Sequence, residues 1–97
     1  MQDLNDMLYF AEVVDQGGFA AAGRSLGIPK SRLSRRVAEL EAQLGARLLQ
    51  RTTRRVALTD AGDAFYRHCA AMRESARAAQ DAVAALQAMH WRPELVI

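Results

Sequence analysis

Apolar residues recur at three- and four-residue steps in three stretches of the first half of the chain, and this spacing is typical of amphipathic helices. The first stretch covers residues 5–16 and stops at two glycines, the second covers residues 19–26, and the third covers residues 30–44. A Gly-Ile-Pro segment at residues 27–29 separates the last two, because glycine supplies a left-handed turn and proline is tolerated where a helix begins. The pattern predicts three short helices with a tight turn between the second and the third.

The pattern changes after Gly45. Residues 47–51 and residues 55–58 are short segments with apolar side chains, and a polar tip at residues 52–54 lies between them. Two short segments joined in this way predict a pair of strands.

A long alanine-rich helix is expected from residue 60 to residue 89 or 90. Thr59 is a good N-cap, and Asp60 and Asp63 place negative charge in the first turn, where the helix dipole favours it. The helix should end before Pro93, because proline disfavours helical backbone in the residue that precedes it. The order of elements predicts a mainly α fold: a winged helix-turn-helix of three helices and a two-stranded wing, followed by a long helix.

Charge is unevenly distributed along the 97 residues, although the net charge is only +2. Residues 1–23 carry a net charge of −4, residues 24–58 carry +7 and residues 59–97 carry −1. All basic residues except Lys30 are arginines, whose planar guanidinium suits forked contacts with phosphates and guanine edges. The basic segment indicates either a surface for a polyanion such as DNA or simply a solvated face.

Several other classes of protein are disfavoured. No apolar run is long enough to span a membrane, and the N-terminal segment is acidic, unlike a signal peptide. The single cysteine, Cys69, excludes a disulfide framework and a cysteine-rich zinc site, while His68 and His90 lie about six helical turns apart. No catalytic triad, phosphate loop or paired carboxylate site is visible. We therefore expect a cytoplasmic module without enzymatic activity, cofactor or metal.

The start of the third helix carries candidate DNA-reading side chains. In a helix-turn-helix, the second helix of the motif enters the major groove with its N-terminal residues against the base edges. Leu33 and Val37 should face the core, so residues on the other side of the helix point outward. Serine can contact a base or a phosphate, and arginine pairs bidentately with guanine. The candidates on this helix are Lys30, Ser31, Arg32, Ser34, Arg35 and Arg36.

The predicted hairpin tip carries a second set of candidates. Three guanidiniums close to a hairpin tip suit contacts with the DNA backbone or the minor groove. These candidates are Arg51, Thr52, Thr53, Arg54 and Arg55.

Taken together, these motifs resemble the N-terminal domain of LysR-type transcriptional regulators. The resemblance extends from residue 4 to about residue 90. Its most specific motifs are Leu40-Glu41 before Leu44-Gly45, then Arg51-Thr52-Thr53-Arg54, then Leu58-Thr59-Asp60-Ala61-Gly62. It implies that Lys30, Ser31, Ser34 and Arg35 occupy DNA-contacting positions and that Arg54 or Arg55 sits in the wing.

The resemblance also implies a division of the chain. Residues 1–59 would form the DNA-binding domain, with the helix-turn-helix at residues 18–37 and the wing at residues 47–58. Residues 60–91 would form a linker helix that mediates dimerisation, and residues 92–97 a tail. Family members continue as a ligand-sensing domain with two α/β lobes, and we expect no small-molecule site within these 97 residues.

A heptad pattern along the long helix predicts a dimer seam. Apolar and small residues alternate there by three and four positions, which is typical of helices that pair with another helix. The seam residues are Phe65, Cys69, Met72, Ala76, Ala79, Val83 and Leu86. The alternative is that this stripe packs only on its own domain. The resemblance implies antiparallel pairing with the same helix of a second copy. For Cys69, a thiol buried in the seam is favoured over a redox switch.

We therefore expect sequence-specific binding of double-stranded DNA by a homodimer, in the service of transcription regulation. Two-fold symmetry predicts a dyad-symmetric site with two recognition helices about one DNA turn apart or slightly more. The alternative is a dimerisation module that forms heterodimers with full-length relatives and so modulates them. The two hypotheses use the same seam and differ in the partner.

Overall fold

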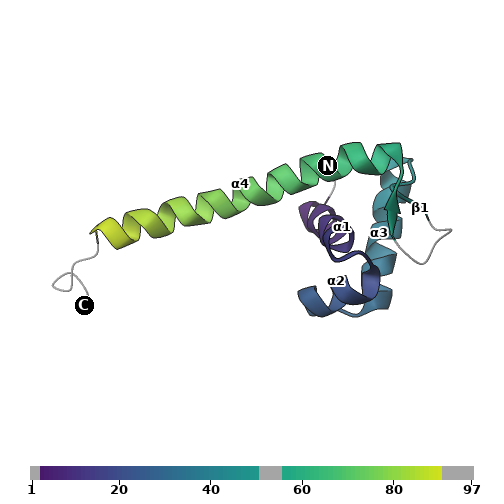
Figure 1. Cartoon of the computed structure of the whole chain (residues 1–97), viewed down its shortest axis with the longest axis horizontal. Helices are drawn as coiled ribbons and strands as arrows, with labels where there is room; N and C mark the ends of the chain where they lie inside the picture. Colours follow the sequence, from purple (N-terminus) through teal and green to yellow (C-terminus); the bar gives the residue numbers. More distant parts are fainter. Residues whose placement is uncertain (1–2, 51–55, 91–97) are drawn as a thin grey trace.

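The computed structural model describes residues 3–50 and 56–90. Three helices come first: α1 (Leu4–Gln16), α2 (Phe19–Leu26) and α3 (Lys30–Leu44). Two antiparallel strands follow, β1 (Leu49–Gln50) and β2 (Ala57–Leu58), and α4 (Asp60–His90) completes the order. The structure thus confirms the predicted mainly α fold, a winged helix-turn-helix followed by a long helix (Figure 1).

The three short helices enclose one hydrophobic core. Leu33, Val37 and Leu40 lie on a single stripe of α3 and are fully buried, in one cluster with Phe10 and Val13 of α1. Each such side chain contributes about 1.5–3 kcal/mol when it is removed from water. Because this stripe faces inward, the opposite side of α3 faces solvent.

The turn between α2 and α3 is tight. Gly27 adopts a left-handed conformation with φ of 71°, which side chains larger than glycine disfavour. The backbone N–H of Ile28 donates to the carbonyl oxygen of Gly23 at 3.0 Å and so ends α2. The break that the sequence predicts at residues 27–29 is therefore confirmed, and it sets the angle at which α3 begins.

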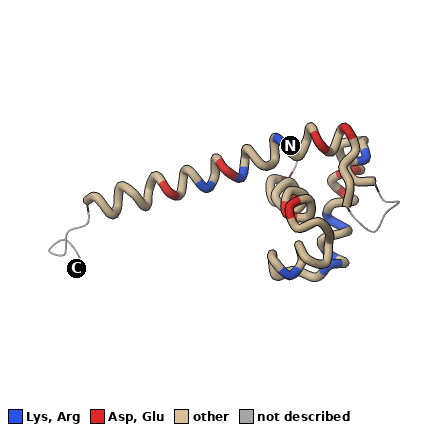
Figure 2. Tube along the Cα trace, in the orientation of Figure 1, with Lys and Arg blue, Asp and Glu red and all other residues tan. Residues whose placement is uncertain are grey.

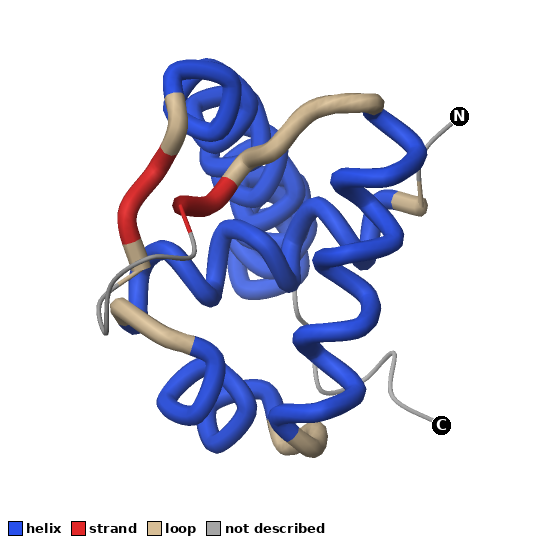
Figure 3. Tube along the Cα trace, turned by 90° about the vertical axis from the view of Figure 1, so that its right-hand side faces the viewer, coloured by secondary structure: helices blue, strands red, loops and turns tan. Residues whose placement is uncertain are grey.

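The strands of the wing connect α3 to α4 (Figure 3). They pair in the register Leu49 with Leu58 and Gln50 with Ala57, and each is shorter than the sequence predicts. The predicted hairpin tip at residues 51–55 lies outside the described residues. Thr59 caps α4 as predicted, because its hydroxyl oxygen accepts the N–H of Gly62 at 2.9 Å.

The long helix α4 packs against the three-helix unit only with its first half. The ring of Phe65 lies 5.7 Å from the ring of Phe10, and Cys69 is fully buried. From residue 74 to residue 90 every residue of α4 is exposed. The molecule is consequently elongated, measuring 60 × 24 × 21 Å, with the second half of α4 extending away from the core (Figure 1).

Candidate nucleic-acid interface

The first two turns of α3 present polar side chains to solvent. Lys30, Ser31, Arg32 and Arg35 are exposed, and Ser34 is half-buried. At 100° per residue, Ser31 and Arg35 lie opposite the buried stripe of Leu33 and Val37, and Arg32 and Ser34 lie on its flanks. Lys30 is exposed as the first residue of α3. The N-cap residue of α3 is Pro29, which offers no side-chain acceptor, so no capping side chain satisfies the N–H groups of the first turn. Positive charge and outward N–H groups at one helix end are what an anionic polymer requires.

Arg24 adds a positive charge that sequence reasoning did not single out. It is exposed in the last turn of α2, immediately before the turn into α3. The basic positions of α2 and of the start of α3 lie at the end of the three-helix unit farthest from α4 (Figure 2). The signal that could have identified Arg24 is its place at the start of the segment with a net charge of +7.

Arg36 has different surroundings from Arg35, although both were candidates for DNA contact. Its Nε lies 2.7 Å from Oδ1 of Asp6, which is almost fully buried, and a terminal nitrogen lies 2.9 Å from Oδ2 of Asp3. The hydrogen bond and the charge of Asp6 raise the pKa of the Arg36 guanidinium. Arg36 therefore ties α3 to the beginning of α1, and its predicted contact with DNA stays a prediction.

The wing candidates Arg51, Thr52, Thr53, Arg54 and Arg55 lie outside the described residues. What the structure does describe is the base of the wing. There the hydroxyl of Thr59 donates to the carbonyl oxygen of Arg47 at 2.5 Å, and the N–H of Thr59 donates to the carbonyl oxygen of Leu48 at 3.0 Å. These bonds fasten the wing to the start of α4.

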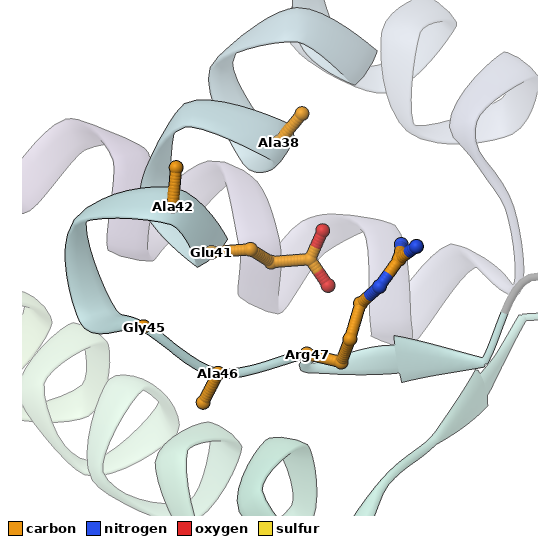
Figure 4. Close-up of a pocket in the computed structure, with 6 residues that line it drawn as sticks. All are labelled: Ala38, Glu41, Ala42, Gly45, Ala46 and Arg47. Atoms are coloured by element: carbon orange, nitrogen blue, oxygen red, sulfur yellow. The ribbon is translucent and has the colours of Figure 1, made fainter.

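Glu41 anchors the wing to α3 from the other side. Its carboxylate oxygen Oε2 accepts the backbone N–H of Leu48 at 2.8 Å and that of Leu49 at 3.2 Å, and the residue is buried. The side chain borders an open concavity of about 560 Å³ between the end of α3 and Arg47, otherwise lined by alanine and glycine (Figure 4). Sequence reasoning treated Glu41 only as part of a motif, because its two donors follow it by seven and eight positions.

The predicted dimer seam is divided by the structure. Phe65 packs on the core and Cys69 is fully buried, so Cys69 is not on the surface that a partner helix could touch. Met72 is half-buried, and the seam from Ala76 onward is exposed. Val83 and Leu86 are each 56% exposed. The stripe thus serves the domain's own core in its first part and leaves an uncovered apolar face in its second.

The environment of Cys69 agrees with the buried-thiol interpretation. Burial raises the pKa of its thiol to about 11, an effect that the nearby charge of Arg73 partly opposes. The thiol is therefore protonated at neutral pH, and the thiolate that oxidation chemistry needs is scarce.

Two further properties concern residues 3–50 and 56–90 alone. No helix there is both long and apolar enough to cross a membrane. Nor do three or more His, Cys, Asp or Glu side chains converge there in a way that could hold a metal ion.

Comparison with known proteins gives a consistent result. The family described as "Bacterial regulatory helix-turn-helix protein, lysR family" matches residues 4–63. An HTH-type transcriptional regulator of Xanthomonas campestris pv. campestris (strain 8004) is 54% identical over 85 residues, which are 88% of this chain and 25% of that protein. The probable HTH-type transcriptional regulator LtrA of Klebsiella pneumoniae is 46% identical over 84 residues, 87% of this chain and 27% of that protein. The chain spans about a quarter of the length of these relatives.

Solved structures show the same fold. The BenM DNA-binding domain in its complex with benA site 1 DNA superposes with a TM-score of 0.81 at 29% identity, covering 92% of this chain and 100% of that one. Full-length AphB, the Vibrio cholerae virulence activator and a member of the LTTR protein family, gives a TM-score of 0.77 at 32% identity, covering 84% of this chain and 28% of that one.

Proposed function

This chain belongs to the LysR family of bacterial helix-turn-helix regulatory proteins, and from that premise we propose that it binds a dyad-symmetric site on double-stranded DNA as a homodimer and so regulates transcription. The observation that carries the proposal is the group of solvent-facing polar and basic side chains at the start of α3. The likeness to a DNA-binding domain solved on DNA supports it further. In this proposal α3 provides base preference, basic residues of α2, α3 and the wing provide phosphate contacts, and α4 provides dimerisation.

Base preference would come from α3. We propose that Lys30, Ser31, Ser34 and Arg35 contact base edges when the N-terminal end of α3 enters the major groove. The exposure of Lys30, Ser31 and Arg35 supports this role. Arginine reads guanine through its O6 and N7 atoms, and serine accepts several partners. We therefore expect Arg35 to be the strongest single determinant among the described residues.

Affinity would come mainly from phosphate contacts. Arg24 on α2 and Arg32 on α3 flank the base-reading residues and are exposed. In a helix-turn-helix the first helix of the motif crosses the DNA backbone, which suits Arg24. The wing residues Arg51, Thr52, Thr53, Arg54 and Arg55 remain our proposed contacts to the backbone or the minor groove.

Dimerisation would use the second half of α4. Its exposed apolar face begins at Ala76 and continues through Ala79, Val83 and Leu86. Small residues at the first two positions allow close approach of a partner helix, and the larger pair fills the remaining space. An antiparallel pairing of two α4 helices would place the two α3 helices on the same side of one DNA duplex.

Selection from a pool of random duplexes tests the proposal directly. The purified chain is incubated with the pool at two salt concentrations, and the retained DNA is sequenced. We expect an enriched motif of two inverted half-sites, centred about one DNA turn or slightly more apart, and a steep loss of binding as salt rises. Retention without any motif would contradict base reading, and a single half-site would contradict the dimer.

Substitution of Arg35 tests whether this residue contacts base edges. Arg35→Ala should weaken binding to the preferred site by about 1–3 kcal/mol and relax its sequence at one or two base pairs. Arg77→Ala is the matched control, because Arg77 is an exposed arginine in the second half of α4, paired with Glu74 at 3.0 Å. The control removes the same charge and should leave base preference unchanged. Equal losses by Arg35→Ala on preferred and random DNA would remove Arg35 from base reading.

A further inference from the structure

A cluster of polar side chains joins α4 to α1 at the point where α4 leaves the three-helix unit. A terminal nitrogen of Arg73 lies 2.7 Å from Oδ2 of Asp15 and 4.0 Å from Oε1 of Glu12. The hydroxyl of Tyr66, two turns earlier on α4, donates to the other oxygen of Asp15. We call these four residues, Glu12, Asp15, Tyr66 and Arg73, the elbow cluster.

The elbow cluster also reaches α2. The other oxygen of Glu12 accepts the hydroxyl of Ser25 at 2.5 Å and the side-chain amide of Gln16 at 3.0 Å. Through Glu12 and Asp15 the orientation of α4 is therefore tied to α1 and, one bond further, to the helix-turn-helix itself.

The position of Arg73 gives the cluster its importance. Arg73 is 26% exposed at its side chain, and the residues of α4 that follow it, 74–90, are all exposed. The apolar contacts of α4 with the core are made earlier, by Phe65, Tyr66 and Cys69. Arg73 is thus the last point at which the three-helix unit holds α4.

The chemistry of the cluster favours one geometry. Asp15 binds a cation and a hydroxyl with its two oxygens at once, and its side chain is only 32% exposed. Hydrogen bonding to Asp15 raises the pKa of both Tyr66 and Arg73, so each group keeps its proton across the physiological range. A partly buried carboxylate that accepts from two donors on one helix is directional.

A small change in the angle of α4 at the elbow cluster moves the far end of α4 by a distance comparable to the spacing of base pairs. The part of α4 beyond Arg73 holds residues 74–90 and is about 25 Å long. A tilt of about 10° over that length moves its end by about 4 Å, comparable to the rise of one base pair, about 3.4 Å. In a dimer joined through that part of α4, such a tilt changes the separation of the two recognition helices.

We propose that Arg73 and Asp15, supported by Tyr66 and Glu12, are positioning residues that determine which spacing between half-sites the dimer accepts. The inference rests on the proposed dimeric binding of DNA. It concerns the distance between half-sites and not the sequence within them, since the cluster lies on the α1–α4 side, away from the start of α3.

The test uses the full chain and a duplex library in which two copies of the selected half-site are separated by spacers of varied length. Arg73→Met removes the charge and keeps most of the side-chain volume, and Asp15→Asn weakens the same pair from α1. Arg77→Met is the matched control, one turn further along α4 and paired only with Glu74 among the described residues. Thermal unfolding of each variant verifies that it folds, and Tyr66→Phe serves as a third, milder variant.

The wild type and Arg77→Met should select one spacing sharply. With Arg73→Met and Asp15→Asn, the preference for that spacing over its immediate neighbours should fall about fivefold, an effect typical of coupled residues in contact. The sequence of the half-site should be unchanged, which a general loss of stability would not produce. If a folded Arg73→Met or Asp15→Asn variant keeps the wild-type sharpness, the inference is overturned. If the wild type itself selects no paired half-sites, the proposed function fails instead.

Discussion

Arg35 and Arg36 are neighbours in α3 but have different surroundings. Arg35 is exposed, whereas Arg36 lies against Asp3 and Asp6, thirty or more positions earlier in the chain. Helical periodicity predicts which side of α3 faces the core, and it did so correctly for Leu33 and Val37. It cannot predict which distant carboxylate meets a particular guanidinium, because that depends on how α1 and α3 cross. Both arginines were therefore candidates for DNA contact on equal terms.

The partners of the buried Glu41 could likewise not be predicted from helical periodicity. Its contacts in the structure lead to a specific prediction. Glu41→Ala leaves two buried N–H groups, those of Leu48 and Leu49, without their acceptor, and should lower the free energy of unfolding by about 2–5 kcal/mol. Glu41→Gln keeps an acceptor oxygen and should cost about 1 kcal/mol. Urea unfolding monitored by circular dichroism measures both.

The control for Glu41 is Glu39→Ala, which truncates an exposed glutamate of the same helix and should change stability by less than about 0.5 kcal/mol. If Glu41→Ala is no more destabilising than Glu39→Ala, the anchoring of the wing by Glu41 is refuted. A wing loosened by Glu41→Ala should also weaken DNA binding at temperatures where the variant remains folded.

Helices were more predictable than strands in this chain. The bounds of α2 and α3 agree with the prediction, and α1 begins one residue earlier than expected because Asp3 caps it by accepting the N–H of Asn5 at 2.8 Å. The strands are only two residues long, since their pairing depends on contacts across the hairpin and not on local propensity. The stripe on α4 was found, but periodicity alone does not distinguish packing on the domain from packing on a partner.

Packing of α4 against the wing depends on Gly62. A Cβ atom there would lie 2.0 Å from the carbonyl oxygen of Leu48 and 2.8 Å from its carbonyl carbon, both of them backbone atoms that cannot move aside cheaply. Gly62→Ala should therefore destabilise the fold by about 1–3 kcal/mol or more, although alanine favours helix by up to about 1 kcal/mol. Differential scanning calorimetry measures the change. Ala64→Gly, at an exposed position of the same turn, gives the size of the propensity effect alone. A stabilised Gly62→Ala variant would show that α4 does not pack this closely on the backbone of Leu48.

The molecule has two exposed regions with different chemistry at its two ends. The polar and basic start of α3 lies in the three-helix unit, and the apolar face of α4 lies in the extended part (Figures 1 and 2). Charge and heptad spacing were enough to predict both regions from the sequence. Their relative placement was not predictable, because it follows from the angle between α1 and α4, and that angle depends on contacts between Arg73, Asp15 and Glu12 that no local pattern encodes.

The proposed dimerisation through α4 would make the affinity for DNA depend on a surface remote from the DNA-contacting residues. Leu86→Glu places a charge on the exposed apolar face, 56% exposed in the single chain, and should shift the protein from dimer to monomer because a buried charge without a partner is costly. Sedimentation velocity measures the mass, and the variant should lose at least tenfold in affinity for the paired site while keeping its affinity for one half-site. Ala88→Glu introduces the same charge on the opposite side of α4 and should remain dimeric, since residues two positions apart on a helix differ by about 200°. A dimeric Leu86→Glu variant would place the interface elsewhere, and the dyad-symmetric site would then require a different geometry of the two recognition helices.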